Sequence, residues 1–294
     1  MGTAREKLVM LGGSGLVGSR LKELLSVTYD VTSFSLETGV DITRPETLSP
    51  LRENSGATLL HLAAKADVDA CEKDQSMGEN GDAWRINVLG TENVARACSD
   101  AGHRMIYVST DFVFDGANTP SGGYGEEDAP NPTNWYATTK YEGEKRTQSA
   151  SASNVIMRIS YPYRAKFDAK SDFVRALLSR LRAGQEVKAV TDHLMTPTYI
   201  DDIAKGIDAI IRKRFEGIIH VVGSSSLSPF DACIAIARAF LLENPTITKV
   251  KRAEFFHGRA PRPFNLTLKN DKIKHLGVQM MTFEEGLKKI ATDL

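Results

Sequence analysis

The feature that most constrains this chain is a glycine-rich turn between an apolar strand and an amphipathic helix. The apolar run "KLVML" (7–11) leads directly into "GGSGLVG" (12–18), and apolar residues then recur on one helical face. Glycines let the backbone approach a ligand, and the first N–H groups of the following helix face a phosphate. The turn fits both GxGxxG and GxxGxxG. We therefore expect a dinucleotide here, in contact with Gly12, Gly15, Leu16, Val17 and Gly18.

Further apolar runs alternate with helical patterns through the first 160 residues. The expected strands are "YDVTSFS" (29–35), "ATLLHL" (57–62), "RMIYVS" (104–109) and "NVIMRI" (154–159). A helix is expected from about Trp84 to Ala101, with Gly102 as its stop. Nearly continuous apolar runs are typical of parallel strands that are covered on both faces. The pattern predicts an α/β fold with a doubly wound parallel sheet of the Rossmann type.

After Ile159 the alternation of strands and helices gives way to a pattern dominated by amphipathic helices. Helices are expected at 173–184 and 201–213, a strand at 217–222, and helix starts at Ser228-Pro229 and at Thr282, which opens a capping box. We expect a dinucleotide-binding domain over residues 1–160. Residues 161–294 are expected to form mainly a smaller, interleaved substrate-binding lobe, with segments around 197–222 returning to the first domain.

Composition excludes several classes of protein. Lysine plus arginine equals aspartate plus glutamate, at 37 each, so no overall field favours nucleic acid or an anionic membrane. The first residues hold too short an apolar run for a signal peptide, and no run approaches the roughly 18 apolar residues of a membrane helix. The three cysteines and six histidines show no metal-ligand spacing. We expect a cytoplasmic protein with buried free thiols and no metal.

The end of the second strand bears on the choice of cofactor. An acid there would hold the ribose hydroxyls of NAD, but counting along the chain brings Ser35 to this position, with Glu37 two residues further on. A serine neither grips the 2'-hydroxyl as a carboxylate does nor repels a 2'-phosphate. We therefore expect NADP(H) or NAD(H), with a slight lean to NADP(H).

The stretch "NWYATTKYEGE" (134–144) holds the expected chemistry. Asn134 is predicted to cap a helix that carries Tyr136 in its first turn and Lys140 on the same face. A free tyrosine has a pKa of about 10, and a neighbouring ammonium and a positive helix end are both expected to lower it. Gly143 would be costly in this helix unless it packs against a backbone or a flat ligand. Without the glycine-rich turn, the same stretch would read as a solvated helix.

These pieces together resemble a known family. The combination of "GGSGLVG", "DVDACE", "INVLGT", "STDFVFDG" and "NPTNWYATTKYEGE" is similar to the extended short-chain dehydrogenase/reductase superfamily. Within it, "DVDACE" followed by "STDFVFDG" most resembles the dTDP-4-dehydrorhamnose reductase family. The resemblance covers most of the chain and implies an NAD(P)-dependent reductase of a nucleotide-linked 4-keto sugar.

The resemblance also implies roles for individual residues. Tyr136 would protonate the substrate carbonyl oxygen, Lys140 would lower the tyrosine pKa and hold the nicotinamide ribose, and Thr110 would hydrogen-bond the same substrate oxygen. Besides Ser35, which is expected from its place at the end of the second strand, the resemblance implies cofactor contacts for Asp41, Ile42, Ala63 and Ala64. The implied substrate contacts are Asp111, Arg158, Pro197 and Arg262.

Departures from the family pattern leave alternatives open. "RISYPYR" replaces the usual threonine-serine-tryptophan pattern on the substrate side, which puts the identity of the sugar in doubt. Phe112 stands where related dehydratases carry a glutamate, and this disfavours a dehydratase. A nucleotide-sugar epimerase and a cofactor-binding regulatory subunit without turnover remain alternatives. The oligomeric state is open as well, with a homodimer as one option.

Overall fold

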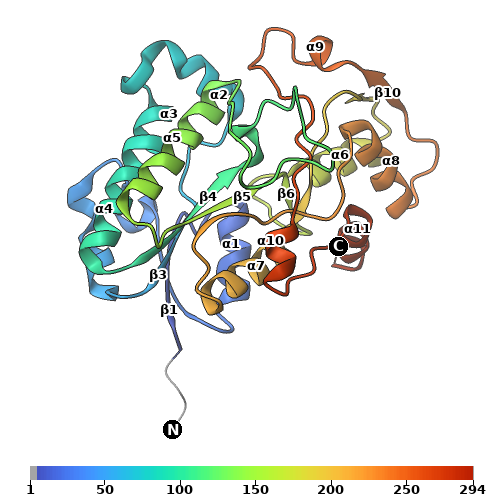
Figure 1. Cartoon of the computed structure of the whole chain (residues 1–294). Coiled ribbons are helices and arrows are strands. Elements are labelled where there is room, and N and C mark those ends of the chain that lie inside the picture. The colour runs from blue at the N-terminus through green and yellow to red at the C-terminus, as the bar shows by residue number, and fades with distance from the viewer. Residues whose placement is uncertain (1–4, 294) are drawn as a thin grey trace.

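The computed structural model describes residues 5–293, and its centre is a six-stranded, fully parallel sheet (Figure 1). The strands, in sequence order, are β1 (Lys7–Leu11), β2 (Asp30–Phe34), β3 (Thr58–His61), β4 (Arg104–Thr110), β5 (Val155–Ile159) and β9 (Gly217–His220). Their order across the sheet is β2-β1-β3-β4-β5-β9. The predicted doubly wound parallel sheet is confirmed, and each predicted strand is present within about two residues of its expected bounds.

Helices cover both faces of this sheet. On one face lie α1 (Leu16–Leu25) and α7 (Ile200–Arg212), which contact each other, and on the other lie α4 (Thr91–Ala101) and α5 (Trp135–Ala150). Side chains alternate along each strand between the two layers. Leu8 and Met10 of β1 join the cluster under α1 and α7, whereas Val9 and Leu11 join the cluster on the opposite face. Burial on both faces explains the continuous apolar runs in the sequence.

The remaining helices gather beside the sheet. These are α6 (Phe173–Arg182), α8 (Pro229–Ala239) and α11 (Phe283–Asp293) (Figure 1). Their buried side chains form an apolar cluster separate from those on the two faces of the sheet. The predicted helix starts are confirmed, because the Ser228 hydroxyl accepts from the Asp231 N–H and Thr282 exchanges hydrogen bonds with Glu285. Four short strands pair in two small parallel sheets and were not predicted: β6 (Pro162–Tyr163), β7 (Val187–Val190), β8 (Thr198–Tyr199) and β10 (Ile247–Val250).

Short helical segments complete the chain. The short α-helices are α2 (Val68–Asp74), α3 (Asp82–Trp84), α9 (Arg252–Phe255) and α10 (Asp271–His275). Single 3-10 segments are Leu36–Thr38, Pro45–Asn54, Gln75–Asn80 and Asp111–Val113. No helix within residues 5–293 is both long and apolar enough to cross a membrane.

Two segments after residue 197 join the first half of the chain. β9 is the edge strand beside β5, and α7 packs against α1. The central sheet is thus completed by residues that follow the first part of the smaller cluster in sequence. A domain division near residue 160 stays a prediction.

The helix expected from about Trp84 to Ala101 contains a π-helical stretch, Arg85–Gly90, between α3 and α4. The buried Asn87 lies in this stretch. Its amide accepts from the Lys65 N–H (2.8 Å) and donates to the Lys65 carbonyl (3.0 Å) and to the Thr139 hydroxyl (3.0 Å). Asn87 of the π-helical stretch therefore links Lys65, in the loop after β3, to Thr139 of α5. Gly102 ends the helix in the left-handed conformation, as predicted (φ 66°).

Gly143 of α5 lies at a close approach between elements. A Cβ atom there would collide with the Tyr107 hydroxyl of β4 and would lie 2.7 Å from the Asn87 carbonyl oxygen. The glycine is therefore needed for packing, as the sequence suggested. It lets α5 lie close to both β4 and the π-helical stretch.

We expect Gly143→Ala to destabilise the fold by about 1–3 kcal/mol, because the added methyl group overpacks the contact with Tyr107 and Asn87. Urea denaturation measures the change in the free energy of unfolding. Ser149→Ala, at an exposed position of the same helix, is the matched control and should change stability little. A Gly143→Ala protein as stable as the Ser149→Ala protein would contradict this packing argument.

Candidate active site

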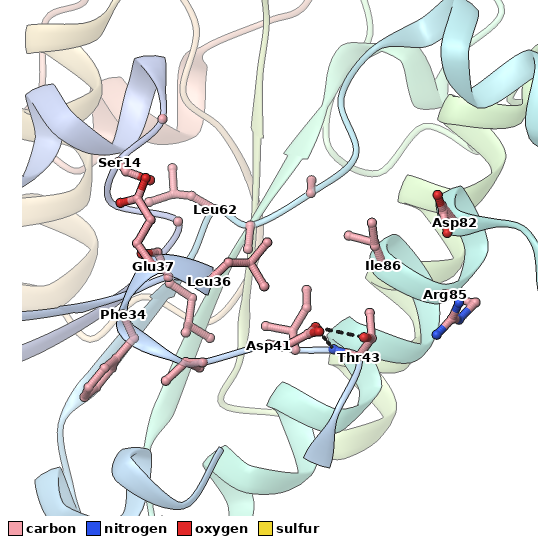
Figure 2. A pocket seen from close by; sticks show the side chains of 18 residues that line it. Ser14, Phe34, Leu36, Glu37, Asp41, Thr43, Leu62, Asp82, Arg85 and Ile86 are labelled. Carbon is pink, nitrogen blue, oxygen red and sulfur yellow. Dashed lines mark hydrogen bonds between the residues drawn. The ribbon is translucent and has the colours of Figure 1, made fainter. Parts of the chain in front are cut away.

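A cavity of about 540 Å³ opens at the carboxyl ends of β1, β2 and β3 (Figure 2). Because β2 and β3 lie on opposite sides of β1, this is a topological switch point of the sheet, where ligands bind in open α/β folds. The lining residues are Leu11, Gly12, Ser14, Gly15, Phe34, Ser35, Leu36, Glu37, Val40, Asp41, Ile42, Thr43, Leu62, Ala63, Ala64, Asp82, Arg85 and Ile86.

The glycine-rich turn forms one end of this cavity. Gly12 has a φ of 87°, and a Cβ atom on it would lie 2.8 Å from the Ala63 nitrogen, so a side chain is excluded on both counts. Gly15 is the N-cap of α1 and supplies no side-chain acceptor to the first turn of the helix. The helix N–H groups and dipole thus face the cavity end without a side-chain cap, which suits a phosphate ligand.

Most of the predicted cofactor contacts meet at this cavity. Seven line it: Gly12, Gly15, Ser35, Asp41, Ile42, Ala63 and Ala64. Leu16 and Val17 lie in the first turn of α1, and Gly18 packs against the Gly12 carbonyl oxygen. The Asp41 carboxylate accepts from the N–H (2.9 Å) and hydroxyl (2.8 Å) of Thr43, so it braces its own loop (Figure 2).

Several residues that line the cavity were not predicted from the sequence. Phe34, Leu36, Val40 and Leu62 provide apolar wall. Asp82 comes from α3, and Arg85 and Ile86 come from the π-helical stretch that follows it, all some 20 residues beyond β3 in the chain. Only the local positions after β2 and β3 could be found by counting from a strand end.

Thr110, Tyr136 and Lys140 are brought together by β4 and α5. Thr110 is the last residue of β4, and α5 starts at Trp135 after Asn134, whose side-chain oxygen accepts from the Ala137 N–H (2.8 Å). This confirms the predicted cap. The ring of Tyr136 packs edge-on against Phe112, with ring centroids 6.1 Å apart.

Lys140 is only 3% exposed and is bound to the strand beneath it. Its ammonium donates to the Val108 carbonyl of β4 (2.8 Å) and lies 4.0 Å from the centroid of the Tyr107 ring. Burial lowers the lysine pKa to about 7, with Glu144 acting in the opposite direction. The lysine therefore changes charge close to neutral pH.

The expected lowering of the Tyr136 pKa is wrong for this structure. Burial raises the pKa above 10, the Thr110 hydroxyl opposes this shift, and the Asp111 charge reinforces it. Desolvation of the buried phenol outweighs the influence of the lysine and the helix end on which the expectation was based. The phenol thus keeps its proton at neutral pH, which is the form that a proton donor needs.

Asp111 lies directly after the catalytic candidate Thr110 and is 2% exposed. Its carboxylate accepts from the Ser160 hydroxyl (2.6 Å) and from the Thr110 hydroxyl (3.1 Å). Burial raises its pKa to about 7, although both hydroxyls act to lower it. This places a second group that titrates near neutrality next to Thr110.

Arg158 is taken up by a buried ion pair. Its Nε and Nη2 atoms donate to the two carboxylate oxygens of Glu144 at 2.9 Å and 2.7 Å, and both side chains are at most 2% exposed. The guanidinium also lies over the Phe114 ring. The structure therefore places Arg158 in the core, whereas the family resemblance implied a substrate contact. Pro197, another predicted substrate contact, is buried too, with its carbonyl oxygen against Gly223.

Arg262 belongs to a strap, residues 256–264, that is fixed to α2. Its Nη2 atom donates to the Asp69 carboxylate (2.9 Å), which also accepts from the Arg259 guanidinium (2.9 and 2.5 Å). Asp69 comes from the "DVDACE" stretch of the sequence. Two arginines thus converge on one carboxylate that links distant parts of the chain.

The same strap reaches the start of α5. The Asn134 side-chain amide donates to the Pro261 carbonyl (2.9 Å), and the His193 Nδ1–H donates to the Pro263 carbonyl (2.7 Å). Since Asn134 is two residues before Tyr136, the strap holds Arg262 near the catalytic candidates.

No group of three or more His, Cys, Asp or Glu residues that could hold a metal occurs in the part of the chain described, residues 5–293. The three cysteines Cys71, Cys98 and Cys233 are buried and free, as expected.

Comparison with known proteins gives one family and two kinds of relative. The profile described as RmlD substrate binding domain matches residues 6–294. dTDP-4-dehydrorhamnose reductase of Mycobacterium tuberculosis is 29% identical over 270 residues, covering 88% of this chain and 82% of the relative. Methionine adenosyltransferase 2 subunit beta of Xenopus tropicalis is 28% identical over 238 residues, covering 78% and 68%.

A solved structure is similar over the whole chain. The crystal structure of dTDP-4-dehydrorhamnose reductase from Bacillus anthracis in complex with NADP has a TM-score of 0.88 and 27% identity, covering 100% of both chains.

A pH-dependent stability is expected from Asp111. Its pKa rises from 3.8 to about 7 on folding, so its contribution to stability is complete below about pH 4 and is lost as the pH rises through 7. Relative to Asp111→Asn, the wild-type free energy of unfolding should fall by about 4 kcal/mol between pH 4 and pH 8. Urea denaturation of both proteins measures the difference, and a flat difference would contradict the assigned burial.

If Arg158 belongs to the core, Glu144→Gln should lower the free energy of unfolding by about 3–5 kcal/mol, because it leaves the buried Arg158 guanidinium without its charge partner. The double variant Arg158→Met/Glu144→Leu should recover most of this loss, and thermal denaturation of the three proteins measures it. If Arg158→Met proved as stable as wild type but bound substrate poorly, Arg158 would belong to the cleft after all.

Proposed function

The chain belongs to the RmlD substrate binding domain family, and we propose that it is an NAD(P)H-dependent reductase of a nucleotide-linked 4-keto sugar. It is an oxidoreductase of the short-chain dehydrogenase/reductase type, and its cofactor is NADP(H) or NAD(H). The observation that carries the proposal is the convergence of Thr110, Tyr136 and Lys140 at the carboxyl end of β4.

The residues of the cavity fit a dinucleotide. An N-terminus of α1 without a side-chain cap, and glycine positions that exclude a side chain, suit a pyrophosphate, while Ile42, Ala63 and Ala64 offer apolar wall for the rings. When bound, the reduced nicotinamide would supply the hydride. Lys140 would hold the ribose hydroxyls next to it.

Tyr136 would act as the acid in this reaction. Its phenol carries a proton at neutral pH because burial raises its pKa, and that proton would pass to the substrate carbonyl oxygen. The Thr110 hydroxyl would donate to the same oxygen and hold it in position. Lys140 in its charged form would stabilise the phenolate that remains, and its pKa of about 7 makes this charge available near neutrality.

The substrate would lie between β4 and the strap. Asp111 and Arg262 remain proposed contacts, because both lie beside Thr110 or the start of α5. A nucleotide diphosphate attached to the sugar would suit the two arginines Arg259 and Arg262, and dTDP is the nucleotide named for the related reductases.

Two alternatives lead to different measurements. A nucleotide-sugar epimerase would keep NAD tightly bound through purification, whereas a reductase exchanges its cofactor. A regulatory subunit, suggested by the similarity to methionine adenosyltransferase 2 subunit beta, would co-purify with an enzyme and bind cofactor without turnover. The three catalytic candidates argue against the second role, because binding alone does not need them. Phe112, a nearly buried aromatic ring, provides no acid of the kind used by related dehydratases.

We expect Tyr136→Phe to lower kcat by about 10²- to 10⁴-fold, because it removes the proton donor and little else. Consumption of NADH or NADPH with a dTDP-4-keto-6-deoxy sugar measures the rate, and cofactor titration checks that binding is retained. Tyr141→Phe, in the same helix, is the matched control and should keep normal turnover. Full activity in Tyr136→Phe would contradict the assigned role.

A further inference from the structure

Glu37 stands on the wall of the cavity directly after β2. It lies in the short 3-10 turn Leu36–Thr38, and Figure 2 shows its side chain reaching towards Ser14 of the glycine-rich turn. Within residues 5–293 its carboxylate has no ion pair or hydrogen bond. Among the described residues, therefore, no cation neutralises the charge of this carboxylate.

The backbone around Glu37 is held in place. The Ser35 N–H donates to the Thr38 hydroxyl (2.9 Å), which in turn donates to the Ser35 carbonyl (2.9 Å), and Gly39 closes the turn at a φ of 82°. The Gly12 N–H donates to the Phe34 carbonyl (3.1 Å), so the end of β2 and the glycine-rich turn are joined. Glu37 is thus carried on a braced turn beside the predicted phosphate site.

The charges along the cavity are mostly negative. Its lining holds the acids Glu37, Asp41 and Asp82 and a single cation, Arg85. Arg85 lies with Asp82 on the opposite side of the cavity from Glu37 (Figure 2). The lining therefore offers no lysine or arginine beside Glu37 that could bind a phosphate group at this place.

NADH and NADPH differ at one position, the 2'-oxygen of the adenosine ribose. A carboxylate accepts a hydrogen bond from the 2'-hydroxyl of NADH and repels the 2'-phosphate of NADPH. We propose that Glu37 is a specificity-determining residue that makes this chain prefer NADH over NADPH. The inference rests on the proposed function and reverses the slight lean that Ser35 alone suggested.

The test is a fluorescence titration of the full chain with NADH and with NADPH, which needs no substrate. Wild type should bind NADPH at least about tenfold more weakly than NADH, or about 1.4 kcal/mol. Glu37→Gln should bind NADPH more tightly than wild type does, so that the two dinucleotides bind with nearly equal affinity. Glu37→Arg should bind NADPH more tightly than NADH. Added salt should reduce the wild-type ratio by screening and leave the Glu37→Gln ratio unchanged.

The matched control is Glu243→Gln, which removes an equal charge at an exposed position after α8 and should keep the wild-type ratio. Equal affinity of wild type for both dinucleotides, or an unchanged ratio in Glu37→Gln, would overturn the inference and leave the proposed reductase standing. Folded wild type that binds neither dinucleotide would overturn both.

Discussion

The candidate site depends on one interaction, the close packing of α5 on β4. Because α5 has few aliphatic side chains, polar contacts hold it against β4, and a glycine lets it come close to the strand. The Lys140 ammonium donates to the Val108 carbonyl, Gly143 makes room for the Tyr107 hydroxyl, and the Thr139 hydroxyl meets Asn87 of the π-helical stretch. Because these contacts fix the depth and rotation of α5, they also fix Tyr136 relative to Thr110 at the end of the strand.

Burial by the same packing decides the chemistry available there. Desolvation favours the neutral form of every titratable group, so it raises the pKa of Tyr136 and Asp111 and lowers that of Lys140. Tyr136 keeps the proton that it is proposed to donate. Asp111 and Lys140 titrate near pH 7, which makes the charge around Thr110 sensitive to pH and to whatever ligand replaces water.

The sheet was predictable because its strands are buried on both faces and carry continuous apolar runs, and helix starts were predictable from local capping residues such as Asn134 and Ser228. Features that depend on contacts between residues far apart in the sequence could not be predicted in this way. The ion pair of Arg158 with Glu144 and the burial of Tyr136 arise from packing between elements. The strands of the small sheets are only two to four residues long, too short for a periodic pattern.

The cavity illustrates the same division. Ser35 and Ala63 could be located by counting from a strand end, whereas Arg85 and Asp82 approach from a helix that starts some 20 residues beyond β3. The ion pairs of Asp69 with Arg259 and Arg262 of the strap join residues about 190 positions apart in the chain. Such pairs cannot be predicted from spacing in the sequence.

The central claim, that the chain transfers hydride to a sugar carbonyl, is tested most directly by following a labelled hydrogen. The protein is incubated with NADH deuterated at C4 and a dTDP-4-keto-6-deoxy sugar, and the product is analysed by NMR and mass spectrometry. The account predicts one deuterium at C4 of a single sugar epimer, with matching oxidation of the cofactor. Cofactor binding without any transfer of label, to any nucleotide-linked 4-keto sugar, would contradict it.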